Sequence, residues 1–464
     1  MSKFSHSSAL LVSLSLLLLA SDKYDPTTLV FPSFLHTLGV RKATTTHLYL
    51  FAGNRVKVND PQGIAAVRLQ NWEDPSRTKD DDEIVVYGVN AGQNVVIYNT
   101  SMNSIAVYGL YEKGERALKT PTGIAAHGDG EVYLADTGNN RIVQFFNPQR
   151  ELQFVRSMGR KGNSPGEFMG PRGVALTASK MLFVADTENH RVQRFRDGKL
   201  EKVWGTPGTN PGQLFRPAGI AATDSSDSWS YHKDNFVVVV DRDSKRLQKF
   251  SLDGRYLTGK SVESFANSTT RLDYCAIDYF SNVYVTDIGD HCIHKFDRNL
   301  NYLCRYGRYG EGDKEFIEPR GMAIYKRFGQ VLIAEKKAVQ YYWVGTDILD
   351  FRASRHPRLP LLQIDYFLTE PSYVTLQILN DRNSVLATSL DKAFRDSGKQ
   401  REILDGHWQS SVPVANGTTL SVSDAALVSE PPVPSGRYAV RIKVEATYSS
   451  HKYFEKTEEA FVEF

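Results

Sequence analysis

The chain has 464 residues, which is long for one domain and favours a division into two. Its formal net charge is only +3, and basic and acidic residues are interspersed along it. Because no polybasic tail stands out, charge gives no support for a general affinity for nucleic acid.

The N-terminus carries a largely apolar run over residues 9–20, after a weakly basic start at Lys3 and His6. Such a run is too short to cross a bilayer comfortably and is typical of a secretory signal. We expect residues 1–20 to be a signal peptide, with Ser21 as the mature start and residues 21–46 as an extension. An uncleaved membrane anchor is the alternative. Export predicts a secreted, periplasmic or cell-surface protein.

One sequence pattern recurs along the following 300 or so residues. It runs Pro-Thr-Gly-Ile-Ala-Ala from Pro121, then Val-Tyr-Leu-Ala-Asp-Thr-Gly-Asn-Asn-Arg from Val132. It returns as Pro-Arg-Gly-Val-Ala from Pro171 and Phe-Val-Ala-Asp-Thr-Glu-Asn-His-Arg from Phe183. More degenerate copies open at residues 61, 217, 273 and 319, which makes six copies.

Each copy holds short runs of β-branched and aromatic residues that alternate at period two between turn residues, as half-buried strands do. Strand-only repeats of this length predict four-stranded propeller blades, so residues 47–350 are expected to form an all-β, six-bladed β-propeller. The last blade of such a ring needs an outer strand. We expect the apolar run at residues 47–57 to be that strand and to close the ring.

The repeats resemble the NHL family, through the Pro-x-Gly-Ile-Ala opening and the Val-Ala-Asp-Thr-x-Asn-His-Arg-Val core. The resemblance covers roughly residues 60–345 and implies the propeller fold. It implies no particular function, because one fold hosts many.

The remaining segment predicts a second all-β domain. Residues 351–360 are basic and contain proline, and are expected to be a linker. About seven strand-like runs in residues 361–464 predict a small β-sandwich. Its order of motifs, with Gly-His-Trp from Gly406 and Pro-Ser-Gly-Arg-Tyr from Pro434, resembles the immunoglobulin-like module of bacterial flagellar-hook capping proteins.

The second residue of each Pro-x-Gly opening is expected to line the mouth of the propeller channel. Arg172 and Arg320 belong to opposite blades, and Asp273 is expected beside Arg320; Gln62 and Thr122 take the same position elsewhere. Two facing guanidiniums could clamp a carboxylate or a sulfate. The alternative, which we favour because ion-pair networks also fill such sites, is that each arginine pairs with a carboxylate of a neighbouring blade and holds the ring together.

One carboxylate also recurs at the end of the second strand of most blades, at Asp136, Asp186, Asp241 and Asp287, with Asn99 and Glu335 in the first and sixth. A ring of metal ligands is one interpretation. Local capping of the turn, with an arginine five residues on as partner, is the interpretation we favour, since a feature of almost every blade is usually what a blade needs to fold.

Two insertions are specific to one blade each, and each carries a tryptophan. Trp72 lies in residues 67–93 and Trp229 in residues 223–234. Aromatic side chains on loops are good contacts for proteins or sugars, and packing beneath their own loops is the equal alternative.

No catalytic motif is present, and we name no catalytic or metal-binding residue. His127, His190 and His291 fall in different blades, so the histidine set of zinc lyases with this fold is not expected. The three cysteines, Cys275, Cys292 and Cys304, are more readily buried thiols than a disulfide, although Cys292 and Cys304 lie on neighbouring predicted strands.

The sequence therefore predicts an exported, non-enzymatic binding or scaffold protein that offers a propeller face to a protein, peptide or glycan. No cofactor and no nucleic acid is expected. A metal-dependent lyase or hydrolase, with calcium or zinc in the channel, is the alternative.

Overall fold

The computed structural model describes residues 27–32, 41–70, 84–101, 104–148, 150–410, 414–415, 418–419, 427, 431–448 and 454–464. The predicted signal peptide and Trp72 lie outside these residues. No helix in the described part of the chain is long and apolar enough to span a bilayer.

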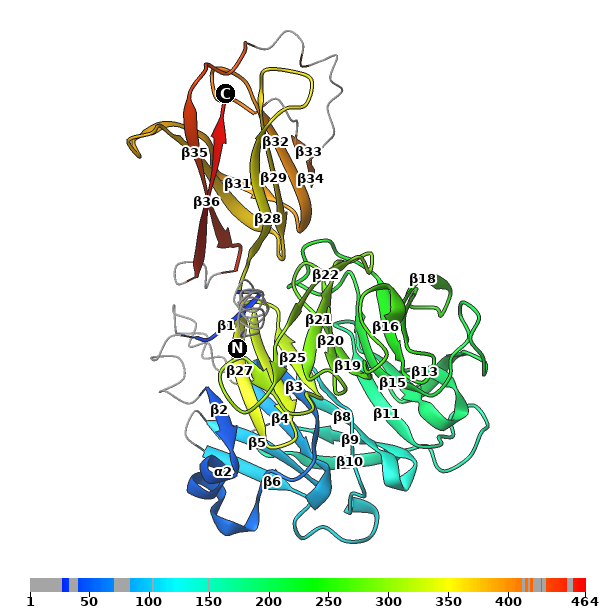
Figure 1. Cartoon of the computed structure of the whole chain (residues 1–464). Helices are drawn as coiled ribbons and strands as arrows, with labels where there is room; N and C mark the ends of the chain where they lie inside the picture. Colours follow the sequence, from blue (N-terminus) through cyan, green and yellow to red (C-terminus); the bar gives the residue numbers. More distant parts are fainter. Residues whose placement is uncertain are drawn as a thin grey trace, which may run out of the picture.

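The predicted all-β propeller is confirmed: the chain forms a ring of six antiparallel sheets (Figure 1). The innermost strands contact one another in chain order, and β25 of blade six contacts β3 of blade one. The blade strands are β3 (Pro61–Val67), β4 (Val85–Asn90), β5 (Val95–Ser101), β6 (Ser104–Tyr108); β7 (Ile124–Ala126), β8 (Glu131–Asp136), β9 (Arg141–Phe146), β10 (Gln153–Met158); β11 (Pro171–Leu176), β12 (Met181–Asp186), β13 (Arg191–Arg196), β14 (Lys199–Trp204); β15 (Pro217–Thr223), β16 (Phe236–Asp241), β17 (Arg246–Phe250), β18 (Tyr256–Ser261); β19 (Leu272–Ile277), β20 (Val283–Asp287), β21 (Cys292–Phe296), β22 (Tyr302–Tyr306); and β25 (Met322–Tyr325), β26 (Gln330–Glu335), β27 (Ala338–Val344).

Blade six is closed from the N-terminal side, but not by the predicted residues. Two short strands, β1 (Leu29–Val30) and β2 (Lys42–Thr44), pair antiparallel with β27. The predicted closing strand at residues 47–57 was wrong: helix α2 (Thr45–Ala52) and a 3-10 turn (Gly53–Arg55) lie there. The Thr44 N–H donates to His47 Nδ1 at 3.2 Å in a capping box, and this local hydrogen bonding favours a helix over a strand.

Apolar clusters fill the five interfaces between successive blades from blade one to blade six. The sixth interface, where the ring closes, instead borders a cavity of about 630 Å³. Ala43 of β2, Leu48 of α2 and Leu332 of β26 are among its lining residues. Closure at this interface therefore depends more on strand pairing and on polar contacts than on a dense apolar core.

The C-terminal part is a second domain of two antiparallel sheets that enclose one core (Figure 1). One sheet has the order β28-β29-β32 and the other β31-β30-β35-β36. Residues 351–360, predicted to be a linker, instead begin within β28, because their alternating side chains pair with β29. The strands are β28 (Ile348–Arg355), β29 (Leu362–Leu368), β30 (Ser372–Leu379), β31 (Val385–Arg395), β32 (Gly398–Leu404), β35 (Arg437–Ala446) and β36 (Glu455–Glu463).

This sandwich docks on loops that join the first and second strands of blades four to six. Tyr231 stacks on Phe394 with ring centroids 6.0 Å apart, and Tyr448 packs on Phe280 at 6.0 Å. These loops lie at the ends of the innermost strands that are remote from the Pro-x-Gly openings. The sandwich therefore leaves the Pro-x-Gly face of the ring uncovered.

A buried charged group lies at this junction. Glu370 of the sandwich is an ion-pair partner of Lys295 in β21, and it accepts a hydrogen bond from Asn282 at 3.1 Å. Asp278 is also buried there, and the one ammonium serves both carboxyl groups. Burial, with the charge of Asp278 added, outweighs Lys295 and raises the pKa of Glu370 to about 8.

We expect the substitution Glu370→Gln to remove a pH dependence of stability. Since the folded pKa is raised above the unfolded value of about 4.3, the stabilising contribution is complete at low pH and is lost as the pH rises through about 8. The wild type should lose on the order of 4 kcal/mol relative to Glu370→Gln between pH 5 and 8.5. Urea unfolding at several pH values measures this, and parallel curves for the two proteins would contradict it.

Candidate functional site at the channel mouth

The six innermost strands approach one another closely where each begins. The N–H of Gly123 donates to the carbonyl of Arg172 at 2.9 Å, and the N–H of Gly63 donates to that of Thr122 at 2.9 Å. A Cβ on Gly123 would lie 2.2 Å from the Arg172 oxygen, which real Cβ atoms do not allow. The glycine of Pro-x-Gly is thus required by close backbone approach, and the residue before it faces the mouth of one channel.

The predicted mouth residues are brought together, but the pairing differs from the expectation. Asp273 Oδ1 accepts from Arg172 at 3.4 Å and from Arg242, which follows β16, at 3.2 Å. Arg320, expected beside Asp273, instead lies 3.5 Å from Asp60 and 3.1 Å from Glu318. Each arginine of the predicted pair therefore has a carboxylate partner, but Arg172 of blade three reaches Asp273 of blade five and not a carboxylate of a neighbouring blade.

Two other predicted positions have different surroundings. Gln62 Nε2 donates to Asp60 Oδ1 at 3.0 Å, so this side chain belongs to the same polar group. Thr122 Oγ1 is hydrogen-bonded to Thr137 Oγ1 at 2.7 Å and to the carbonyl of Arg172 at 3.0 Å. Both bonds of Thr122 connect neighbouring chain segments, so its hydroxyl is already used within the ring.

Tyr274 is a mouth residue that the sequence reasoning missed. It takes the glycine position of blade five, and its phenol is buried. Burial raises the pKa of Tyr274, and the nearby charges that act on this phenol are those of Arg172, Asp273, Arg320 and Asp60. The signal was present as a break in the pattern, because Leu-Asp-Tyr replaces Pro-x-Gly at residues 272–274.

The cluster contains both hydrogen-bond donors and hydrogen-bond acceptors that have no partner. Five buried atoms there have no partner among the described residues: Gln62 Oε1, Arg172 Nε, Asp273 Oδ2, Tyr274 Oη and Arg320 Nε. Leaving one such atom unsatisfied costs about 1–3 kcal/mol. The mouth therefore offers donors on arginine and tyrosine next to acceptors on glutamine and aspartate, in a setting that favours their use by a bound molecule.

The surroundings of Arg172 favour its charged form. Burial acts to lower the pKa of Arg172, but the charges of Asp273, Tyr274 and Asp60 outweigh it, and the pKa lies above its usual value. The Arg172 and Arg320 side chains keep 21% and 19% of their surface exposed. The Arg172 guanidinium therefore stays charged, and both guanidiniums are partly open to the solvent.

The repeated turn carboxylates cap their own turns, which is the interpretation that the sequence favours. Asp136, Asp186 and Asp241 are buried, and each accepts from the arginine five residues on, at 2.7, 2.8 and 2.7 Å. Each also caps a backbone N–H of the connector that leads into its own blade. In blade six, Glu335 pairs with Lys42 of β2 at 2.7 Å, so an ion pair at the same position stabilises the closing strand.

Asn99 does not hold this position in blade one. The turn residue after β4 is Asn90, which accepts from the N–H of Asn59 at 2.8 Å. Asn99 lies within β5 and bonds the backbone of Ile84 and Val86. The long insertion before β4 displaced the repeat by one strand, and the assignment of Asn99 was wrong for that reason.

The remaining candidates lie elsewhere. Trp229 is 42% exposed and contacts the Arg327 guanidinium at 4.9 Å, on the face that carries the sandwich. His190 accepts from the N–H of Arg216, and His291 from the N–H of Glu318, each at 3.0 Å. The three cysteines are free and buried. These histidines serve separate connectors and do not meet in the channel.

Comparisons with known proteins agree with the propeller. The family model described as the NHL repeat matches residues 118–145 and 168–195. Protein SUPPRESSOR OF QUENCHING 1, chloroplastic, from Arabidopsis thaliana is 31% identical over 84 residues, which is 17% of this chain and 8% of that protein. The chain thus spans less than a tenth of the length of this curated relative.

Solved structures of similar fold include enzymes. Virginiamycin B lyase from Staphylococcus aureus is 15% identical, with 56% of this chain and 77% of that chain covered and a TM-score of 0.40. A gluconolactonase from Xanthomonas campestris is 11% identical, with 69% and 96% covered and a TM-score of 0.43. Likenesses at these values carry no information on activity. The chain holds NHL repeats in a β-propeller, and the immunoglobulin-like character of its second domain stays a prediction.

Proposed function

We propose that this NHL-repeat propeller is a binding module whose channel mouth takes an anionic peptide segment. The observation that carries the proposal is the cluster of five buried, unpartnered polar atoms around Arg172, Asp273, Tyr274 and Arg320. The turn carboxylates, by contrast, are satisfied by donors within their own blades.

The chemistry of the cluster matches a peptide better than a simple anion. A carboxylate can receive a bidentate pair of bonds from a guanidinium, and Arg172 and Arg320 supply two. Gln62 Oε1 and Asp273 Oδ2 are acceptors and would take amide N–H donors. A peptide with an acidic residue or a free C-terminus offers both kinds of group within a short length.

The rest of the chain fits an exported scaffold under this proposal. The apolar run at residues 9–20 would direct the chain out of the cell, to a secreted, periplasmic or cell-surface location. The sandwich, as an immunoglobulin-like spacer, would leave the mouth exposed because it docks on the opposite loops. No catalytic group and no cofactor is assigned to the mouth.

The proposal is tested by probing arrayed acidic peptides with the labelled chain. Each peptide is present with a free and with an amidated C-terminus, beside uronate-containing and sulfated glycans. We expect capture of acidic peptides. Preference for glycans, or hydrolysis or cleavage of a probe without retention, would contradict the proposal and favour a glycan-binding or an enzymatic propeller.

A further inference from the structure

Blade five departs from the other blades at its turn carboxylate. In blades three and four the buried aspartate accepts from an arginine five residues on and from a glutamine seven residues on, which is Gln193 at 3.0 Å and Gln248 at 3.2 Å. In blade five the aspartate is Asp287, and the same two positions hold Cys292 and His294. A cation and a neutral donor are thus both replaced by side chains that bind metals.

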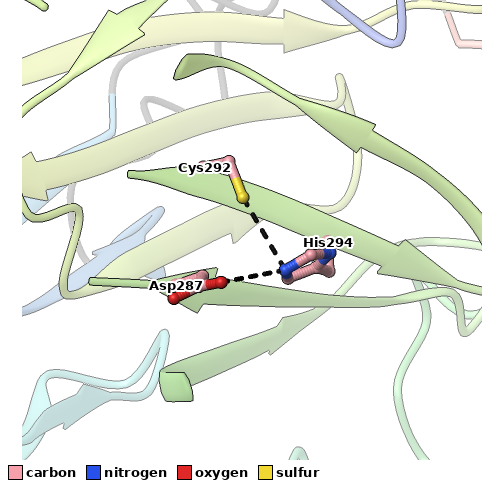
Figure 2. A group of neighbouring side chains, drawn as sticks. All are labelled: Asp287, Cys292 and His294. Carbon is pink, nitrogen blue, oxygen red and sulfur yellow. Dashed lines mark hydrogen bonds and ion pairs between the residues drawn. The ribbon is translucent and has the colours of Figure 1, made fainter. Parts of the chain in front are cut away.

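The three side chains converge (Figure 2). His294 Nε2 lies 3.1 Å from Asp287 Oδ2 and 3.7 Å from Cys292 Sγ, and one ligand atom from each residue lies within 4.8 Å of the others. Asp287 Oδ1 accepts from the backbone N–H groups of Arg271 and Gly289 at 2.8 and 2.9 Å, which orients Oδ2 toward the histidine. Among the described residues, these three form the group of His, Cys, Asp or Glu side chains whose ligand atoms all lie this close together.

The two distances from His294 Nε2 suit a tetrahedral zinc ion to which these side chains would supply three ligands. Bond lengths of about 2.0–2.1 Å to nitrogen and oxygen and about 2.3 Å to sulfur place N and O roughly 3.3 Å apart, and N and S roughly 3.6 Å apart. A carboxylate, an imidazole and a thiolate are also ligands that zinc accepts together. The ion would need no rearrangement of the strands, because Asp287 and Cys292 are already cross-strand partners.

The charge balance points the same way. All three side chains are buried, and blade five lacks the arginine that neutralises the aspartate in blades two, three and four. A divalent ion bound to one carboxylate and one thiolate leaves no net charge, with the thiol proton released to solvent on binding.

We propose that Asp287, Cys292 and His294 form a structural zinc site inside blade five, separate from the channel mouth. The ion replaces the arginine of blades two, three and four and ties the turn after β20 to β21. It does not depend on the peptide-binding proposal, since none of the three residues belongs to the mouth cluster.

The full-length chain tests this with metal analysis and cobalt substitution. We expect about one zinc per chain after gel filtration, a thiolate-to-cobalt charge-transfer band after exchange, and a thermal midpoint that falls by roughly 5 °C when a strong chelator removes the metal. The double variant Cys292→Arg, His294→Gln gives blade five the arginine and the glutamine of blade four. It should fold and bind no metal, and the chelator should not change its thermal midpoint. Should it fail to fold, Cys292→Ser replaces it and should lose the charge-transfer band.

Cys304→Ser is the matched control, because Cys304 is buried in the same blade outside the cluster. It should retain the metal and the absorption band. Wild-type protein that holds no stoichiometric metal and shows no response to zinc or chelator would overturn the proposal and leave His294 as the hydrogen-bond partner of Asp287. Equal metal content in the double variant would overturn it as well.

Discussion

Replacing Asp186 with alanine is expected to lower the free energy of unfolding by about 3–5 kcal/mol, the cost of breaking a buried ion pair from one side. The Asp186 carboxylate is fully buried, and its donors are the N–H of Met169 (2.8 Å), Asn189 (2.8 Å), Arg191 (2.8 Å) and Gln193 (3.0 Å). Alanine leaves the Arg191 guanidinium buried without its charge partner. Urea unfolding followed by tryptophan fluorescence measures the loss.

Glu188→Ala is the control in the same turn. Glu188 pairs with Arg216 at 2.6 Å, but both side chains are about 40% exposed, so the pair should be worth no more than about 1 kcal/mol. Equal destabilisation by the two variants would show that the turn carboxylates do not hold the blades together. A small effect of Asp186→Ala would reopen their interpretation as ligands.

Gly123→Ala is expected to destabilise the ring by about 3 kcal/mol. The added Cβ would lie 2.2 Å from the carbonyl oxygen of Arg172 and 2.9 Å from the nitrogen of Val174, and both are backbone atoms that cannot rotate away. Blades two and three would have to separate at the mouth. Thermal and urea unfolding measure the change.

Gly88→Ala supplies the comparison within a strand. A Cβ there would meet only the carbonyl of Ile97, at 3.9 Å, so the substitution should be neutral or stabilising by about 0.5 kcal/mol. If Gly123→Ala is tolerated equally well, the close approach of the innermost strands is not what selects glycine in Pro-x-Gly.

The repeat made most of the fold predictable, because each copy carries its own turn chemistry and strand pattern. The position of Arg172 and Asp273 at the mouth followed from aligning the copies, and both do lie there. Which carboxylate each arginine holds did not follow, since the choice depends on side-chain reach across the channel. Asp60 and Arg242 contribute from outside Pro-x-Gly and had no signal in the repeat.

The errors have local causes. The apolar alternation at residues 47–57 favours a strand, but the Thr44 and His47 capping contacts decide for a helix. Residues 351–360 contain prolines and charges typical of a linker, yet β28 extends to Arg355 because β29 is available as its partner. A local capping contact decided the first case, whereas a tertiary contact with β29 outweighed local propensity in the second.

The central claim is that Arg172 and Arg320 bind an anionic peptide at the channel mouth. The most direct measurement is a calorimetric titration with the tightest-binding free-carboxylate peptide of the array. Three proteins are titrated: the wild type, the double mouth variant Arg172→Gln with Arg320→Gln, and the double control variant Arg160→Gln with Arg308→Gln. The control pair removes the same charge from the connectors that follow the outermost strands of blades two and five, where Arg160 and Arg308 are 82% and 76% exposed and each pairs with a glutamate. We predict that the mouth variant weakens Kd by about 100-fold or more while the control changes it less than about threefold. Equal Kd values for all three proteins, or an equal loss in both variants, would contradict the account.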